Sequence, residues 1–355
     1  MEQINLHSCG RRAASVLHHR TISLTLMETL DGNELCFPQL LNTSCKKVQH
    51  PKFAAILVYI LLSCISLLTV TLNLLVIISI SHYKQLHTPT NLLLLSLAVS
   101  DFFVGFLMLF QIVLLDGCWF FGDMICAAYY VLDYTITSAS IGTMVLISVD
   151  RYVAICDPLH YPTKITQTRL QISISLCWTF SLIFHTVRFK DNLKQPGRYN
   201  SCVGQCVVVI DYAAGLTDLL MSFIGPVTVI VVLYIKVFGA AVSHARAMRS
   251  HITAVTLQYS LKIGVKKTEM KTAAALGVVV VVFLICVCPY YCVVLTGQET
   301  LLNASTSAFI ICLFYFNSCL NPLIYTFFYS WFRKSVRLIV TLKILQADSR
   351  NTHIP

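Results

Sequence analysis

The chain has 355 residues, of which 56% are hydrophobic and only 12% are charged. This balance excludes an ordinary soluble domain, in which about 25% of residues are charged. The net charge of +10 could suggest nucleic-acid binding, but the basic residues gather in short segments between long apolar stretches. We therefore assign the charge to membrane topology and expect membrane lipid, and no nucleic acid, as a partner.

Seven apolar segments are long enough to cross a bilayer, which needs about 20 helical residues. They lie at about 53–81, 89–115, 123–156, 168–188, 207–243, 270–296 and 303–329. None alternates polar and apolar residues as a strand does, so the sequence predicts an all-α membrane protein with a seven-helix transmembrane domain at 53–329. Residues 1–52 are expected to be an extracellular segment, of which 1–26 could be an upstream extension before Met27, and 330–355 a membrane-surface helix and short cytoplasmic tail.

The loops between the spans indicate the orientation, because cytoplasmic loops are the richer in lysine and arginine. Basic residues crowd the loops after spans three and five and the tail, whereas the loops after spans two and six contain none. The N-terminus is therefore expected outside a plasma membrane. Two Asn-X-Ser/Thr triplets, at Asn42 and Asn303, would then be glycosylation sites on the outer side.

Polar motifs stand at fixed places in these spans, namely Asn73, Asp101, Asp150-Arg151-Tyr152 and Asn321-Pro322-Leu323-Ile324-Tyr325. Together they resemble the rhodopsin-like G-protein-coupled receptors over about 53–343. The shorter stretches 84–91, 157–163, 202–206 and 329–334 resemble the trace amine-associated receptors of that family. The resemblance implies signalling through a heterotrimeric G protein of the stimulatory class, a chemosensory (olfactory) role and no enzymatic activity.

Asp133 is the first candidate ligand-binding residue, because an ionised group inside an apolar helix costs about 2.5 to 3.5 kcal/mol on insertion scales and needs a partner. By resemblance, Asp133 stands where amine-binding members hold the ligand ammonium, and Tyr315 braces it. A structural aspartate paired with another side chain is the alternative. We disfavour it because the sequence shows no lysine or arginine at a matching depth.

Asp218 is the second candidate, at a depth comparable with Asp133 and eight residues before Pro226, or about 12 Å along a helix. Members that resemble diamine sensors hold a second aspartate here. Two facing carboxylates repel one another unless a dication lies between them, so we expect a diamine ligand. Protonation of one of the two acids is the alternative, and Asp211 is either an acidic entrance or a solvated rim residue. Tyr290 and Tyr291 would supply aromatic faces for the cation.

The resemblance implies further sites. Disulfides would join Cys126 to Cys206 and Cys45 to Cys202, with Cys36 competing for Cys202, since spacing alone does not fix connectivity. A polar set inside the spans would hold a structural sodium ion, or else serve only as a hydrogen-bonding network. That set is Asp101, Ser140, Asn317, Ser318 and Asn321.

The resemblance also implies an activation switch. Arg151 would be held by Asp150 and Glu269 until activation frees it for the G protein, with Tyr152, Tyr234 and Tyr325 taking part. Ile141, Pro226 and Phe283 match the family's core relay. Val287 departs from the family, which usually has a tryptophan two residues before Pro289, and the smaller side chain puts the usual toggle step in doubt.

The sequence thus favours a receptor for small amines, with diamines preferred. A monoamine receptor, or a ligand-orphan or impaired receptor of the same family, remains the alternative. A cation transporter could use the intramembrane acids, but no internal repeat is visible. A membrane enzyme would need a metal or nucleophile constellation, and His185 stands alone in its span.

Overall fold

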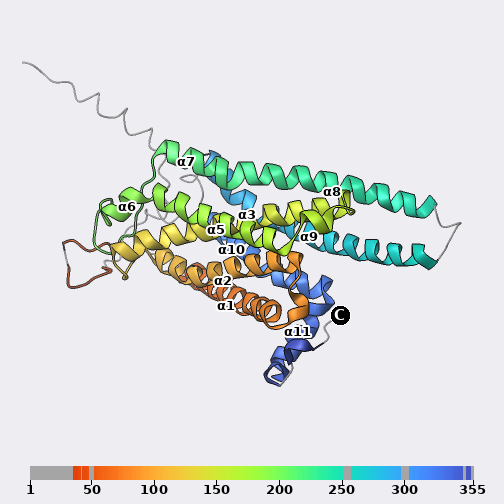
Figure 1. Cartoon of the computed structure of the whole chain (residues 1–355). Coiled ribbons are helices and arrows are strands. Elements are labelled where there is room, and N and C mark those ends of the chain that lie inside the picture. The colour runs from red at the N-terminus through yellow and green to blue at the C-terminus, as the bar shows by residue number, and fades with distance from the viewer. Residues whose placement is uncertain are drawn as a thin grey trace, which may run out of the picture.

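The computed structural model describes residues 35–40, 42–47, 52–250, 257–296, 304–346 and 349–352, and over these ranges the chain is an elongated helical bundle (Figure 1). Seven of its helical spans are long and apolar enough to cross a membrane, which confirms the predicted fold class. Six spans are single helices: α1 (Lys52–His82), α2 (Pro89–Asp116), α3 (Asp123–Cys156), α5 (Gln167–Arg188), α9 (Leu257–Thr296) and α10 (Ala304–Phe328).

The fifth span is interrupted. It consists of α7 (Tyr212–Leu219), a π-helical turn η3 (Leu220–Ile224) and α8 (Gly225–Ser250). The helix begins five residues later than expected, because Asp211 caps it by accepting a hydrogen bond from the Ala214 amide at 2.8 Å. This exposed cap is the role that the structure gives to Asp211. Single π-helical turns inside α-helices often mark functional sites, and this one begins two residues after Asp218.

Short helices join the spans: η2 (Lys84–Leu86), α4 (Tyr161–Lys164) and α6 (Lys190–Lys194). Local sequence explains several boundaries. The Thr88 side chain caps α2 with Pro89 at its first position, and Gly117 ends it with a φ of 75°, which suits glycine.

The third span, α3, is central and packs against α2, α5, α8 and α9. One apolar core surrounds its first half and includes Trp119, Tyr129 and Phe189. A second core surrounds its other half and includes Ile141 and Phe283. Asp133 lies on α3 toward the first half, so the helix carries this carboxylate into the interior of the bundle.

The predicted surface helix is present as α11 (Ser330–Val340), which packs against α1 and α10 (Figure 1). Its apolar face buries Trp331 and Phe332. On its polar face, Arg333 donates from Nη1 to the Thr326 carbonyl at 2.8 Å, which satisfies a carbonyl at the end of α10. The short turns η5 (Lys343–Leu345) and η6 (Ser349–Asn351) follow it.

Candidate functional site

A cavity opens among α2, α3, α9 and α10 on the half of the bundle nearest the disulfides. Its volume is about 70 Å³. Asp133 lines it from α3 and forms no ion pair with a described residue. The other lining residues are Gln111, Tyr129, Tyr130, Tyr134, Thr137, Tyr290, Tyr291, Ile311, Phe314 and Tyr315.

The cavity walls are mostly aromatic, and their packing fixes the rings. Tyr290 lies 5.0 Å from Phe314 between ring centroids, and Tyr291 stacks on Phe223 at 4.0 Å. Tyr129 donates its hydroxyl hydrogen bond to Gln111 at 2.9 Å. Tyr290, Tyr291 and Tyr315, the three tyrosines that the sequence analysis singled out, all line the same cavity as Asp133. A cation beside Asp133 would therefore meet aromatic faces as well as a carboxylate.

Asp218 is placed differently from the expectation. Arg188, the last residue of α5, points its Nη1 at Asp218 Oδ1 across 2.9 Å, and both side chains are buried. Ser222 donates to the same carboxylate oxygen at 2.9 Å. The premise that no arginine lies at the depth of these acids is therefore wrong. Arg188 ends the fourth span, as the sequence predicted, but its side chain points inward to Asp218 rather than to water.

The ion pair lies behind the aromatic wall of the cavity. The guanidinium of Arg188 sits over the Tyr134 ring at 4.5 Å from its centroid and over Phe189 at 5.2 Å. Neither Arg188 nor Asp218 lines the cavity that contains Asp133. The opposite charges of Arg188 and Asp218 offset one another, so this region offers a ligand one uncompensated carboxylate, that of Asp133.

Three disulfides tie the end of the bundle beside this cavity. Cys126–Cys206 and Cys45–Cys202 are the predicted pairs, and Cys36–Cys118 is a third that sequence reasoning missed. The spacing of the cysteines gave no signal that Cys36 would pair with Cys118. A backbone hydrogen bond also links the disulfide-bonded segments, since the Trp119 amide donates to the Gly204 carbonyl at 2.7 Å. Asn42 is exposed on the same segment, and Asn303 lies outside the described residues.

The predicted polar set is buried in the middle of the bundle. Asn321 donates from Nδ2 to Asp101 Oδ2 at 2.8 Å. The Oδ1 atoms of Asp101, Asn317 and Asn321 are buried without a hydrogen-bond partner among the described residues. Ser140, Asn317 and Ser318 also line one small cavity. Oxygen donors of this kind suit a hard cation, so the residues fit a sodium ion.

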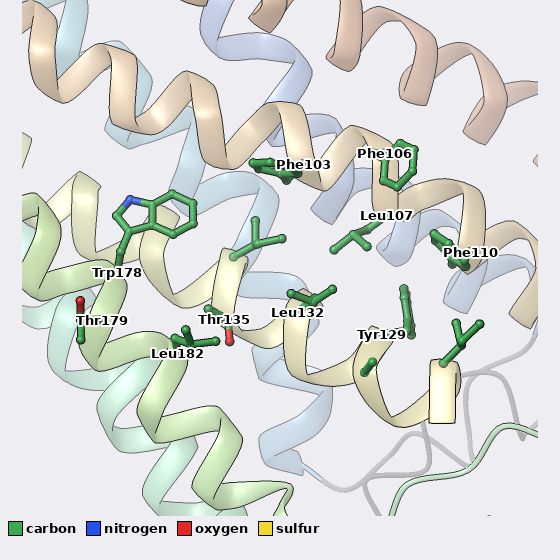
Figure 2. A pocket seen from close by; sticks show the side chains of 13 residues that line it. Phe103, Phe106, Leu107, Phe110, Tyr129, Leu132, Thr135, Trp178, Thr179 and Leu182 are labelled. Carbon is green, nitrogen blue, oxygen red and sulfur yellow. The ribbon is translucent and has the colours of Figure 1, made fainter. Parts of the chain in front are cut away.

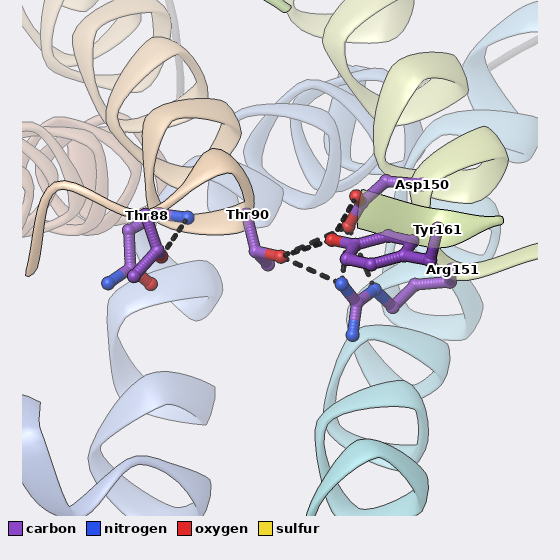
Figure 3. A network of polar contacts seen from close by, with 6 residues as sticks. Thr88, Thr90, Asp150, Arg151 and Tyr161 are labelled. Atoms are coloured by element: carbon purple, nitrogen blue, oxygen red, sulfur yellow. Dashed lines mark hydrogen bonds and ion pairs between the residues drawn. The ribbon is translucent and has the colours of Figure 1, made fainter. Parts of the chain in front are cut away.

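The switch residues meet at the opposite end of the bundle (Figure 3). Arg151 Nε donates to Asp150 Oδ2 at 3.0 Å, and both side chains are buried. Thr90 on α2 accepts from Arg151 Nη2 at 2.7 Å and donates to Asp150 at 3.2 Å. Tyr161 on α4 donates to Asp150 Oδ1 at 2.8 Å. Sequence reasoning missed Thr90 and Tyr161, although both lie in the stretches that carried the family resemblance.

Tyr161 is a reliable donor in this network. Burial, and then the negative charge of Asp150, raise the pKa of Tyr161 to about 12. The phenol therefore stays protonated at physiological pH and donates to Asp150, and its oxygen also lies 3.4 Å from the Thr90 hydroxyl on α2. The predicted contact of Arg151 with Glu269 falls on a side chain outside the described residues.

The remaining switch tyrosines flank this network. The hydroxyls of Tyr234 on α8 and Tyr325 on α10 are buried and have no hydrogen-bond partner within the described ranges. Tyr152 is half-buried, with Lys236 Nζ 5.8 Å from its ring centroid. In a different arrangement of the helices, these two buried hydroxyls could form the hydrogen bonds that they lack here.

The family model described as "7 transmembrane receptor (rhodopsin family)" matches residues 72–325. Trace amine-associated receptor 8a of Rattus norvegicus is 38% identical over 330 residues, which cover 89% of this chain and 95% of that protein. Trace amine-associated receptor 9 of the same species is 38% identical over 90% of this chain and 97% of its own length. Trace amine-associated receptor 13c of Danio rerio is 35% identical over 91% of this chain and 97% of its own length. The chain is a trace amine-associated receptor of the rhodopsin family.

Membership in the trace amine-associated receptors makes the chain a multi-pass receptor of the plasma membrane and not an enzyme. A ligand and a heterotrimeric G protein are its partners as a member of this family. The cavity that contains Asp133 and the Arg151 network lie toward opposite ends of this receptor.

Val287 stands two residues before Pro289, where the family usually has a tryptophan. It is buried and lines a small cavity of about 20 Å³ with Ile141, Phe283 and Phe314. Phe314 and Thr137 also line the cavity that contains Asp133, so Val287 lies next to that cavity, on its side toward the middle of the bundle. Pro226 of the predicted relay follows the π-helical turn at the start of α8. The small cavity below is lined by Val104, Ile141, Val287, Phe283 and Phe314 together with the polar Thr137, Ser140, Asn317 and Ser318, and no indole is among these lining residues.

Proposed function

We propose that this receptor binds small amines with one cationic group, held by Asp133. The observation that carries the proposal is the unequal environment of the two acids. Asp133 lines the cavity without an ion-pair partner among the described residues, whereas Asp218 is paired with Arg188 outside it. A buried carboxylate favours an ammonium through a charge-assisted hydrogen bond, which is stronger away from water.

The diamine hypothesis required two free carboxylates. A second ammonium could reach Asp218 only after Tyr134 or Tyr291 moved and Arg188 gave up its partner. Breaking a buried ion pair leaves an uncompensated charge and costs about 3 to 5 kcal/mol. The alternative from the sequence, a monoamine, therefore becomes the preferred ligand class. The relatives carry "trace amine" in their names, which agrees with an amine ligand.

We propose that the disulfide end, with Asn42 as a glycosylation site, faces outward and that the Arg151 end meets a stimulatory G protein. The distribution of basic residues and the family resemblance support this orientation. A ligand activates such a receptor only by binding the active arrangement more tightly than the inactive one. A chemosensory role is proposed on the family resemblance alone.

We also propose that Asp101, Asn317 and Asn321 hold a sodium ion together with Ser140 and Ser318. The three unsatisfied Oδ1 atoms support this assignment. Such an ion would supply the positive charge that a buried carboxylate otherwise lacks.

The experiment that tests the amine site measures cyclic AMP in cells that express the receptor, with a panel of small primary amines. We expect Asp133→Asn to raise the amine EC50 about a hundredfold, because the variant loses a buried charge pair with the ligand. Asp211→Asn is the matched control, because it removes an exposed carboxylate and keeps a good helix cap. Equal potency of wild type and Asp133→Asn, at equal surface expression, would contradict the proposal.

A further inference from the structure

Gln111 brings a side-chain amide from α2 into the cavity that contains Asp133. The side chain is 5% exposed and lines the cavity. Its Oε1 atom accepts the hydrogen bond from the Tyr129 hydroxyl at 2.9 Å, which is the only hydrogen bond of the Gln111 side chain within the described residues. Unlike the Oδ1 atom of Asp101, which is fully enclosed by protein, the Nε2 atom of Gln111 is open to the cavity. This nitrogen is therefore free to donate to a ligand.

Packing around Tyr129 holds the amide in this orientation. The rings of Phe110 and Trp119 lie against the Tyr129 ring, with centroids 5.8 Å and 6.0 Å away. Tyr129 and Phe110 also line an apolar groove among α2, α3 and α5, where Figure 2 shows the two side chains close together. Because the fixed phenol donates to Oε1, the other arm of the amide remains for the cavity. An amide nitrogen donates and does not accept, so this arm has one possible role toward a ligand.

The amide and the Asp133 carboxylate lie at different levels of the same cavity. Tyr129 and Asp133 are four residues apart on α3, so they share one face of the helix, about one turn apart. Gln111 bonds to Tyr129, on the side of Asp133 that is nearer the Cys126–Cys206 disulfide. The cavity thus offers an acceptor for an ammonium at one level and a donor at the next. A ligand whose ammonium is held by Asp133 extends its other end toward Gln111.

We propose that Gln111 makes this receptor favour small amines that carry a hydrogen-bond acceptor, such as an ether or alcohol oxygen, a few bonds from the ammonium. The inference rests on the proposed amine function and narrows its ligand class. A ligand that fills the cavity removes Nε2 from water. A hydrocarbon chain at this level leaves a buried donor unpaired, which costs free energy, whereas an oxygen accepts its hydrogen.

The test uses pairs of amines in which one CH₂ group is replaced by an ether oxygen, which accepts but cannot donate. The pairs are butylamine with 2-methoxyethylamine and pentylamine with 3-methoxypropylamine. The EC50 of each amine is measured by cyclic AMP in cells that express the full-length receptor, at matched surface expression. The readout is the EC50 of the hydrocarbon divided by that of the ether, so that effects on expression and coupling cancel.

Gln111→Met removes the amide and keeps a side chain of similar length. In at least one pair, we expect the ratio to fall about three- to tenfold from wild type to Gln111→Met, as loss of one net hydrogen bond predicts. The different cost of taking an ether and a hydrocarbon out of water is the same for both receptors and cancels in this comparison. An equal ratio in wild type and Gln111→Met for both pairs would overturn the proposal.

Two further variants separate donation to the ligand from other roles. Tyr129→Phe removes the partner of Gln111 but leaves the amide in the cavity, so its ratio should stay closer to wild type than that of Gln111→Met. Thr137→Val removes a hydroxyl that lines the cavity one turn beyond Asp133 on the other side, and should keep the wild-type ratio. If Tyr129→Phe loses the ratio as fully as Gln111→Met, the amide serves only to hold Tyr129. If Thr137→Val loses it instead, the ether binds at the other level, and either result would overturn the proposal.

Asp133→Asn distinguishes failure of this inference from failure of the amine site. Both members of each pair carry the ammonium, so this variant should raise both EC50 values by the same factor. If it changes neither value, or if no amine activates the receptor, the amine site falls and this inference falls with it. If Asp133→Asn weakens both amines while Gln111→Met leaves the ratio unchanged, the amine site stands and the role of Gln111 alone is wrong.

Discussion

Arg188 Nη1 lies 2.9 Å from Asp218 Oδ1, and the two side chains are 2% and 6% exposed. This ion pair joins the end of α5 to the start of the fifth span and occupies the carboxylate that the sequence offered as a second amine site. The two acids at similar depth therefore have different surroundings. Asp218 is paired across two helices, whereas Asp133 lines the cavity without an ion-pair partner among the described residues.

Removing Arg188 should destabilise the receptor strongly. Arg188→Met leaves the Asp218 charge buried and unpaired, which costs about 3 to 5 kcal/mol. Thermal unfolding of the purified receptor should therefore begin at a clearly lower temperature. Arg198→Met is the control, because Arg198 is exposed and bonds to Gln195 on the surface. The double variant with Asp218→Asn should recover much of the loss, and a double variant as unstable as the single one would refute the role of the pair.

The Arg151 network should restrain basal signalling. Thr90→Val removes the hydroxyl that accepts from Arg151 and donates to Asp150. Loss of hydrogen bonds to charged groups costs about 1.5 to 3 kcal/mol, so we expect basal cyclic AMP to rise severalfold. Thr163→Val, which removes an exposed hydroxyl bonded to the His160 carbonyl, serves as the comparison. Unchanged basal activity in Thr90→Val would show that Thr90 does not hold the inactive arrangement.

The third disulfide should contribute to stability. Cys36→Ser, Cys118→Ser and the double variant should lose the same amount, because each removes the same bond. Disulfides contribute about 2 to 4 kcal/mol. Cys64→Ser is the matched control, since Cys64 is a free cysteine. Peptide mapping under non-reducing conditions should recover Cys36 joined to Cys118, and recovery of Cys36 joined to Cys202 would contradict the assignment.

The floor below the amine cavity should not tolerate the family's usual tryptophan. Val287 is 3% exposed and packs within the core that contains Ile141 and Phe283. Val287→Trp overfills this core at a cost of about 1 to 3 kcal/mol, so both unfolding temperature and amine potency should fall. Val287→Ile adds one methylene and should be nearly neutral. Improved potency in Val287→Trp would indicate that the floor has room for the larger ring.

The seven spans could be predicted because their length and apolarity depend on local sequence alone. The direction of a side chain at a helix end does not depend on local sequence alone. Arg188 could have pointed to water or inward, and only the position of Asp218 on another helix decides between these. The same limit applies to Cys118, whose partner is 82 residues away in the chain. Thr90 is part of the switch because α2 brings it to Arg151, a contact that no local pattern indicates.

Asp133, by contrast, could be identified early, because an acid in an apolar helix is conspicuous whatever surrounds it. Tyr315 was identified through the family resemblance, and Tyr290 and Tyr291 were identified as aromatic side chains that could face a cation.

The most direct test of the central claim compares a monoamine with a diamine of the same chain length, on wild type and Asp218→Asn, with cyclic AMP as the readout and surface expression matched. One free carboxylate predicts that the monoamine is at least as potent as the diamine, and that Asp218→Asn changes the two potencies by the same factor. The account would be contradicted if the diamine were about tenfold or more as potent as the monoamine on wild type and lost this preference in Asp218→Asn. Such a preference would mean that the second charge contributes about 1.4 kcal/mol to binding.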